Sequence, residues 1–204
     1  MTARDSKLLA AVLLVLLGVA PCARAAVADP AVVPVESLTA ALDKSMQAGP
    51  ATSMAERYRN LEAVVARAYA LPLMTRICVG PDWTKLSADE QKAVIAAFTR
   101  YIVASYAHNF RESDGKKFEI DDNVASRGQD KIVRARLTLP HDMPANLLYR
   151  LHEVDGAWKV VDVYYNGVSE LNLRRTDFAA ALGAGGVTEL IAHLNKLSDD
   201  LMKS

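Results

Sequence analysis

The stretch WKVVDVYYNGVSELNLRRTDF, residues 158–178, carries the strongest signals for the fold of this chain. Its first part is rich in Val and Tyr, which favour β-strands. Asn166 and Gly167 then form a pair that is typical of tight turns between strands. Twin arginines, Arg174 and Arg175, follow before an apolar segment with helical spacing. The stretch therefore predicts a strand, a turn and a helix, and nothing in it is typical of a catalytic site.

Upstream of this stretch, apolar and polar residues alternate with the period of two that β-strands have. The alternation is found near residues 118–124, 133–139 and 147–151. Asp155 and Gly156, a strong hairpin signal, connect the last of these segments to the strand that begins at residue 158. We expect about four strands in an antiparallel meander, with one face covered by helices.

The other segments have the spacing of amphipathic helices. Ser87 and Glu90 form a capping box, in which each side chain satisfies a backbone amide at a helix start. The expected helical segments are residues 36–47, 53–69, 87–110, 176–182 and 187–202, and residues 71–75 form a short apolar element. The fold class is therefore α+β, with a curved antiparallel sheet of about four strands packed against a helical layer.

The apolar side chains are numerous for one modest sheet. Hydrophobic residues make up 51% of the chain, and many occupy core-facing positions of the expected helices and strands. A sheet that curves away from its helices leaves room for an apolar cavity. An ordinary filled core is the alternative.

The first 25 residues have the pattern of a secretory signal peptide. Basic residues precede an apolar run at 8–19, which is shorter than the ~20 residues needed to span a bilayer. Small residues follow, and we expect cleavage after Ala25 or Ala28, which would place the protein in the periplasm. An uncleaved anchor and a lipoprotein cleaved before Cys22 are the alternatives.

The segment after the leader divides into two parts. Residues 26–35 are rich in Ala, Val and Pro and are expected to form a flexible tether, and residues 36–204 are expected to form a single domain. The whole chain has a formal net charge of zero, which does not favour nucleic-acid binding. Cys78 is the only cysteine after the leader, so an internal disulfide is excluded.

The sequence has no recognisable catalytic or metal-binding pattern. Its four histidines, at positions 108, 141, 152 and 193, are not paired at the spacing that metal sites on helices use. Motifs of nucleotide-binding loops and of serine hydrolases are absent. We therefore expect no cofactor, no metal and no enzymatic activity, with an unrecognised hydrolase site as an alternative.

Several segments resemble, in the same order and with similar spacing, the MlaC family of periplasmic lipid-binding proteins, also called toluene-tolerance auxiliary proteins. They are WTKLSADEQ at residues 83–91, Phe98, WKVVDV at 158–163, GVS at 167–169, RRTDF at 174–178 and LIAHL at 190–194. The resemblance covers the chain from about residue 36 to its end. The LNLRRTDF pattern is closest to the hopanoid-associated branch, HpnM, so the resemblance implies either a phospholipid or a hopanoid as cargo.

The resemblance implies a carrier rather than a catalyst. Such a protein holds acyl chains, or a hopanoid, in its apolar interior and moves them between the inner and outer membranes. Its implied partners are an inner-membrane ABC transporter with an MCE-type subunit and an outer-membrane acceptor complex. A ligand-free adaptor of a membrane transport or hopanoid-biosynthesis complex is the second interpretation.

With this resemblance, the alternation and helical spacing select residues for the wall of a lipid pocket. The expected lipid-binding residues are Leu73, Met74, Phe98, Tyr101, Ile102, Leu137, Leu147, Tyr149, Leu151, Val160 and Tyr164. Arg174 and Arg175 can hold a phosphate head group at the pocket mouth, since a guanidinium group binds phosphate through two hydrogen bonds. Solvation of these arginines, or pairing with Glu170 or Asp177, is the alternative.

Overall fold

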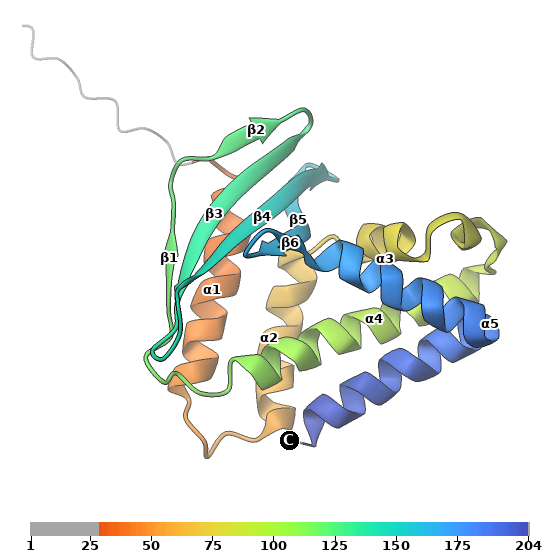
Figure 1. Cartoon of the computed structure of the whole chain (residues 1–204), viewed down its shortest axis with the longest axis horizontal. Coiled ribbons are helices and arrows are strands. Elements are labelled where there is room, and N and C mark those ends of the chain that lie inside the picture. Colours follow the sequence, from red (N-terminus) through yellow and green to blue (C-terminus); the bar gives the residue numbers. More distant parts are fainter. Residues whose placement is uncertain (1–28, 204) are drawn as a thin grey trace, which may run out of the picture.

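The computed structural model describes residues 29–203 as one layer of helices and one antiparallel sheet (Figure 1). The helices of this part of the chain are α1 (Val32–Gln47), α2 (Met54–Ala68), α3 (Leu71–Val79), the 3₁₀ helix η1 (Gly80–Lys85), α4 (Ala88–Asn109) and α5 (Glu170–Met202). The strands are β1 (Lys117–Ile120), β2 (Ala125–Arg127), β3 (Asp130–Thr138), β4 (Ala145–Val154), β5 (Ala157–Tyr165) and β6 (Val168–Ser169).

The sheet confirms the predicted antiparallel meander but has six strands within the described residues instead of about four. Its order is β1-β3-β4-β5-β6, with β2 also paired to β3. β1 covers the start of the predicted first strand, whereas β2 lies after that predicted strand. The two-residue strand β6 follows the turn after β5. Asn166 and Gly167 form that turn with φ values of 48° and 86°, the left-handed conformations that a tight hairpin turn requires.

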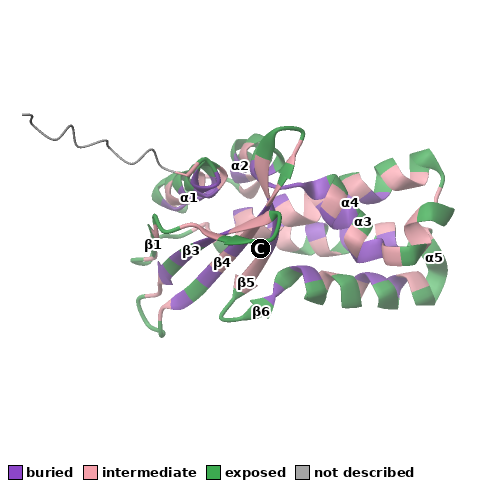
Figure 2. Cartoon of the chain, turned by 90° about the horizontal axis from the view of Figure 1, so that it is seen from above, coloured by how far each residue is buried: buried purple, intermediate pink, exposed green. Residues whose placement is uncertain are grey.

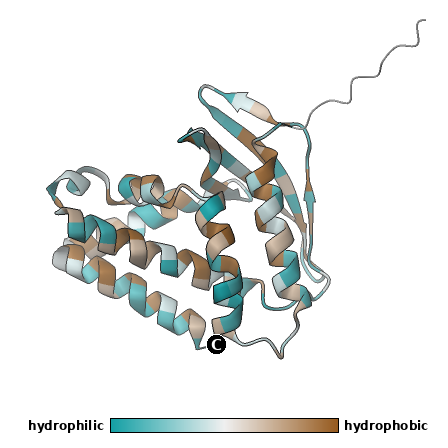
Figure 3. Ribbon diagram, turned by 180° about the vertical axis from the view of Figure 1, so that it is seen from behind, coloured by the Kyte–Doolittle hydropathy of each residue, from teal (hydrophilic) through white to brown (hydrophobic). Residues whose placement is uncertain are grey.

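The helices cover one face of the sheet and extend beyond it. α1 and α2 lie against the sheet, whereas α3, α4 and α5 form a bundle to one side (Figures 1 and 2). Hydrophobic and hydrophilic residues alternate along the helices (Figure 3), as expected for helices with one buried face. Phe98 of α4 and Phe178 of α5 meet edge to face, with 5.1 Å between ring centroids, and both are fully buried. This contact lies at the centre of the bundle.

The N-terminal boundary of the fold differs from the prediction. α1 begins at Val32 rather than Glu36, and Ala31, Val32 and Val35 are at most 3% exposed. The assignment of residues 31–35 to a flexible tether was therefore wrong, because their apolar side chains pack into the core. The predicted signal peptide and the first residues of the predicted tether lie outside the described residues.

α5 begins six residues earlier than predicted, at Glu170 instead of Thr176. Ser169 caps it by accepting the N–H of Asn172 at 3.0 Å. The buried carboxylate of Asp162 on β5 accepts the N–H of Leu171 at 3.0 Å and the hydroxyl of Ser169 at 2.7 Å. The helix start is therefore fixed by a residue of the neighbouring strand.

α5 is divided by glycines, as the sequence predicted. Gly186 has a φ of 68° and the backbone leaves the helical conformation at Gly185 and Gly186. The second half of the helix therefore folds back beside α4 (Figure 1). Among the described residues, no helix combines the length and apolar character that crossing a membrane would require.

Cys78 lies in α3 beneath the start of α5. It is 2% exposed, and its sulfur approaches the carbonyl oxygen of Leu171 at 3.8 Å. Burial raises the pKa of its thiol to about 12. Cys78 is therefore a small buried side chain that remains protonated at neutral pH.

Candidate functional site

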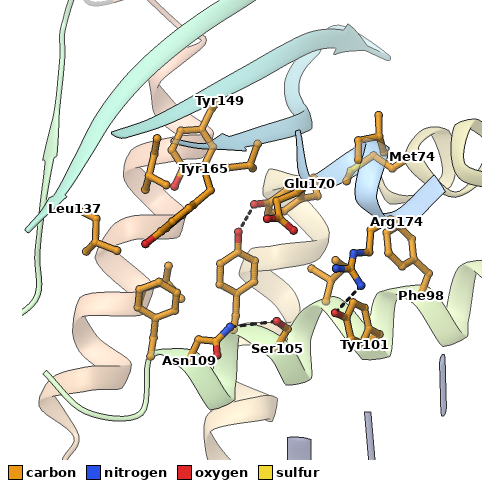
Figure 4. Close-up of a pocket in the computed structure, with 18 of the residues that line it drawn as sticks. Met74, Phe98, Tyr101, Ser105, Asn109, Leu137, Tyr149, Tyr165, Glu170 and Arg174 are labelled. Carbon is orange, nitrogen blue, oxygen red and sulfur yellow. Dashed lines mark hydrogen bonds between the residues drawn. The ribbon is translucent and has the colours of Figure 1, made fainter. Parts of the chain in front are cut away.

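A cavity of about 260 Å³ lies between the inner face of the sheet and the helices. Its walls come from α4, from the inward-facing residues of β3, β4 and β5, and from the first turns of α5 (Figure 4). Most of the side chains that line it are aliphatic or aromatic. The sequence allowed either a filled core or a cavity between the sheet and the helices, and the structure has a cavity there.

α4 forms one wall because its lining residues recur every three to four positions. Phe98, Tyr101, Ile102, Ser105, Tyr106 and Asn109 all line the cavity, and this spacing places them on one face of the helix. The opposite wall is formed by alternate strand residues, including Leu147 and Tyr149 of β4. The helical repeat of α4 and the alternation along the strands therefore explain which residues of the two walls face the cavity.

The structure brings together seven of the eleven residues that the sequence selected for the pocket wall. The seven that line the cavity are Met74, Phe98, Tyr101, Ile102, Leu137, Leu147 and Tyr149. Leu73, Leu151, Val160 and Tyr164 do not line it. Leu151 and Val160 are instead opposite each other in the ladder, completely buried in the filled part of the core.

Tyr164 was assigned to the wrong face because β5 contains a bulge. The register shifts between Arg150 and Leu151, which pair with Asp162 and Val160, so that Val161 is an extra residue. An extra residue reverses which side chains face inward further along the strand. Val163 and Tyr165 line the cavity in place of Tyr164.

Aromatic residues that the sequence interpretation missed form a row along the cavity. The ring centroids are 6.0 Å apart for Tyr69 and Tyr106, 5.9 Å for Tyr106 and Phe110, and 5.5 Å for Phe110 and Phe118. Tyr106 continues the helical spacing of Phe98 and Ile102, and that signal could have identified it. Tyr69 lies between two helices, where no periodicity marks its direction.

The hydroxyl groups of Tyr69 and Tyr106, both of which line the cavity, form a hydrogen bond to each other. Burial raises the pKa of Tyr69 well above its ordinary value and that of Tyr106 to about 12. Both hydroxyls therefore stay protonated at neutral pH. They add hydrogen-bonding groups to a wall that is otherwise largely apolar.

The twin arginines are separated in the structure. Arg174 lines the cavity and donates from Nη1 to the hydroxyl of Tyr101 at 2.9 Å and to the carboxylate of Asp177 at 2.8 Å. Its guanidinium group lies 5.3 Å from the centre of the Tyr101 ring. Arg175 is exposed and does not line the cavity. Of the two predicted head-group residues, the structure places only Arg174 at the site.

The rim of the cavity carries Asn109, Tyr165 and Glu170, all of which are exposed. Within residues 29–203, no group of three or more His, Cys, Asp or Glu side chains is arranged to hold a metal ion. The arrangement is an apolar interior with internal tyrosine hydroxyls and polar residues at its opening. It is suited to binding a largely apolar molecule that has a polar end.

The fold and this site define an α+β protein with an apolar cavity enclosed between a sheet and a helical layer. Residues 36–196 match the family model described as MlaC protein. Because the match covers well over half of the chain, the chain belongs to the MlaC family. The more specific resemblance to the hopanoid-associated branch has no support from these comparisons.

A solved structure with the same fold is that of the phospholipid-binding protein from Ralstonia solanacearum in complex with a phospholipid. It superposes with a TM-score of 0.71 at 19% sequence identity, over 85% of this chain and 98% of that chain. At this identity the similarity establishes the fold. A search of curated protein sequences found no match.

Proposed function

We propose that this protein is a phospholipid carrier that holds acyl chains in the cavity and leaves the head group at the opening. The observation that carries the proposal is the apolar cavity of about 260 Å³ between the sheet and helices. Membership of the MlaC family and the fold shared with a phospholipid-bound protein support it. Apolar walls favour acyl chains because each buried methylene contributes roughly 0.8 kcal/mol relative to water.

The size of the cavity bears on how lipid is loaded. Pockets for small ligands typically measure about 300–1,000 Å³, so the present cavity is small even for a ligand of that class. A lipid with two acyl chains needs more room. Loading such a lipid would therefore require the sheet and the helices to move apart.

Arg174 is the residue proposed to meet the head group. Its guanidinium group is about 20% exposed and can bind a phosphate through two hydrogen bonds. Its partners are Asp177 and Tyr101, and the side chain of Asp177 is 44% exposed. An exposed ion pair contributes little to stability, so exchanging this partner for a phosphate costs little.

The cellular role is proposed from the family and the N-terminal sequence. The predicted signal peptide would export the chain to the periplasm, where it would move lipid between an inner-membrane ABC transporter with an MCE-type subunit and an outer-membrane acceptor complex. The chain acts as a carrier and performs no catalysis. A hopanoid is the alternative cargo, and the sequence pattern around Arg174 is the only feature that favours it.

The cavity favours carriage over the two other interpretations. A ligand-free adaptor would have a filled core and would use a flat apolar patch. A hydrolase would have converging side chains with shifted pKa values, including a nucleophile or base near the substrate. The polar side chains of the walls are Tyr hydroxyls, Ser105, Asn109, Glu170 and Arg174. The hydroxyl of Ser105 accepts a hydrogen bond from the amide of Asn109 at 3.3 Å, which is not the pairing of a nucleophile with its base.

Lipid extraction from the protein tests the proposal directly. The full-length chain is expressed in a Gram-negative host, purified from the periplasm without detergent and examined by native mass spectrometry. We expect a bound species with the mass of a diacyl phospholipid, released on denaturation. Protein that is free of lipid, and that also fails to extract it from vesicles, would contradict the proposal. For the hopanoid alternative, the host must be a strain that makes hopanoids.

The separation of the twin arginines supplies a matched pair of variants. Arg174→Ala should weaken phospholipid retention about tenfold, since a hydrogen bond to a charged group contributes about 1.5–3 kcal/mol. Arg175→Ala, one residue further along the same helix, should leave retention unchanged. Retention is measured as the transfer of a fluorescent phospholipid from protein to acceptor vesicles. Equal retention by both variants would exclude Arg174 from the head-group site.

A further inference from the structure

Tyr149 has an unusual position in the wall of the cavity. It lies on β4, is 2% exposed and lines the cavity. Its side chain extends from the sheet into the space opposite α4, and no hydrogen bond joins it to the other residues drawn (Figure 4). Among residues 29–203, its hydroxyl has no hydrogen-bond partner, in contrast to the hydroxyls of Tyr69, Tyr101 and Tyr106.

The hydroxyl of Tyr149 borders the open space of the cavity, where a molecule that enters the cavity can reach it. A strand position in an apolar wall would also accept Phe, as Phe118 of β1 shows in the same cavity. The hydroxyl of Tyr149 is therefore available to a partner that enters the cavity. Burial holds the pKa of Tyr149 well above its ordinary value, so the group remains a donor.

The Tyr69–Tyr106 pair provides a second donor nearby. When two hydroxyls form one hydrogen bond, the accepting hydroxyl keeps its own hydrogen and can donate it elsewhere. Proximity to Tyr149 contributes to raising the pKa of Tyr69, and proximity to Tyr106 contributes to raising that of Tyr149. All three tyrosines line the same cavity, and the ring centroids of Tyr69 and Tyr106 are 6.0 Å apart. The Tyr69–Tyr106 pair and Tyr149 can therefore each offer one donor to a molecule in the cavity.

The surroundings indicate which acceptor fits these donors. An anionic oxygen buried in an apolar space needs a compensating positive charge, and the cation that lines the cavity is Arg174, which is paired with Asp177. Glu170 also lies on the cavity wall and contributes to raising the pKa values of Tyr69 and Tyr106. These groups favour a neutral acceptor, such as a carbonyl oxygen, at Tyr149.

We propose that the hydroxyl of Tyr149, together with the Tyr69–Tyr106 pair, binds the ester carbonyl oxygens of an acyl lipid inside the cavity. The inference rests on the proposed lipid-binding function and adds a chemical preference to it. Hydrocarbon walls alone would accept any apolar chain. Two internal donors would instead select cargo whose chains are joined to the polar end through esters.

A competition between ester and ether lipids tests this selection. Lipid-free full-length protein is incubated with vesicles of equimolar dioleoyl phosphatidylglycerol and its diether analogue, which has the same head group and chains but lacks both carbonyl oxygens. The loaded protein is separated and its lipids are distinguished by mass. We expect about a fivefold preference for the diester lipid, which corresponds to about 1 kcal/mol, one net hydrogen bond.

Two Tyr→Phe variants locate the source of the preference. Tyr149→Phe should load both lipids almost equally. Tyr164→Phe is the matched control, since Tyr164 lies on the adjacent strand and does not line the cavity, and it should keep the preference of the original chain.

The outcomes separate this inference from the proposed function. Loading of both lipids without preference, or a preference that Tyr149→Phe retains, would overturn the ester site and leave the carrier function intact. Failure to load either lipid would overturn both.

Discussion

The two ends of the interface between sheet and helices are built from similar residues, yet one is filled and the other is hollow. At the filled end, Leu151 of β4 and Val160 of β5 are completely buried. At the hollow end, Leu147 and Tyr149 of the same strand β4 line the cavity. Side-chain chemistry along β4 does not account for this difference, since the inward residues of both ends are large and apolar.

The backbone between α2 and α3 accounts for it. Tyr69 forms a parallel bridge with Val160, and the N–H of Ala70 donates to the carbonyl oxygen of Val160 at 2.9 Å. These contacts fasten the helical layer to β5 at the filled end. At the other end, β5 turns away at Asn166 and Gly167 and α4 ends at Asn109. A direct main-chain link therefore closes the filled end. The described contacts include no such link at the hollow end, which leaves room for the cavity.

Truncating one leucine at each end should give the largest difference in stability between the two ends. Leu151→Ala should lower the free energy of unfolding by about 2–5 kcal/mol, because it creates a void in a filled core. Leu147→Ala should lower it by less than about 2 kcal/mol, since this side chain already borders empty space. Urea unfolding of lipid-free protein measures both values. Equal losses would show that the two ends are packed alike.

Removal of single hydroxyl groups should give a smaller and more specific difference. Tyr106→Phe leaves the buried hydroxyl of Tyr69 without its partner and should destabilise the lipid-free protein by about 1–2 kcal/mol. Tyr149→Phe removes a hydroxyl that has no partner among the described residues and should be neutral or slightly stabilising. Thermal unfolding of the two variants compares them directly. A destabilised Tyr149→Phe would mean that its hydroxyl is satisfied in the empty protein.

The smallest expected effect concerns an ion pair at the filled end. Lys131, which pairs with Leu151 in the sheet, contacts the carboxylate of Asp29 at 2.6 Å. Burial alone would raise the pKa of Asp29, but the hydrogen bonds from Lys131 and the Ala31 N–H, with the charge of Lys131, lower it below 3.8. A lowered carboxyl pKa adds stability above the pKa of the unfolded chain, and this stability is lost as the pH falls through the folded value.

Asp29→Asn tests that ion pair because the amide oxygen can still accept the N–H of Ala31. The variant should be less stable than the original chain by up to about 1 kcal/mol near neutral pH. The difference should shrink as the pH falls below about 4 and the carboxylate of Asp29 takes up a proton. Asp142→Asn, at an exposed loop position, is the matched control. A difference that does not depend on pH would exclude the charge of Asp29 as its cause.

The elements of the fold could be predicted where their signals are local. Ser53 and Ser87 cap α2 and α4 as their sequences indicate, and Ser87 and Glu90 form the complete capping box. The start of α5 could not be predicted in this way, because Asp162 fixes it from the neighbouring strand. The buried start of α1 was missed for a related reason, since valines between prolines show no helical period until their packing partners are known.

Residues of the candidate site could be predicted wherever the spacing of apolar residues stays regular along the whole helix or strand. α4 keeps its period, and Phe98, Tyr101 and Ile102, which that period selects, all line the cavity. β5 loses its period at Val161, and the inward positions move to Val163 and Tyr165. A bulge of this kind depends on pairing with β4, which the sequence of β5 alone does not reveal.

The burial of Cys78 has a practical consequence for studying this protein. Its thiol is enclosed beneath α5 and, with a pKa of about 12, almost none of it is thiolate at neutral pH. Thiol reagents attack the thiolate form, so folded protein should leave this residue unlabelled. A cysteine introduced at Val168, which is 52% exposed on the strand next to the cavity opening, would then react selectively. In the chain without the predicted leader, which contains Cys22, a single spectroscopic probe could thus be attached beside the opening without removing any native residue from the core.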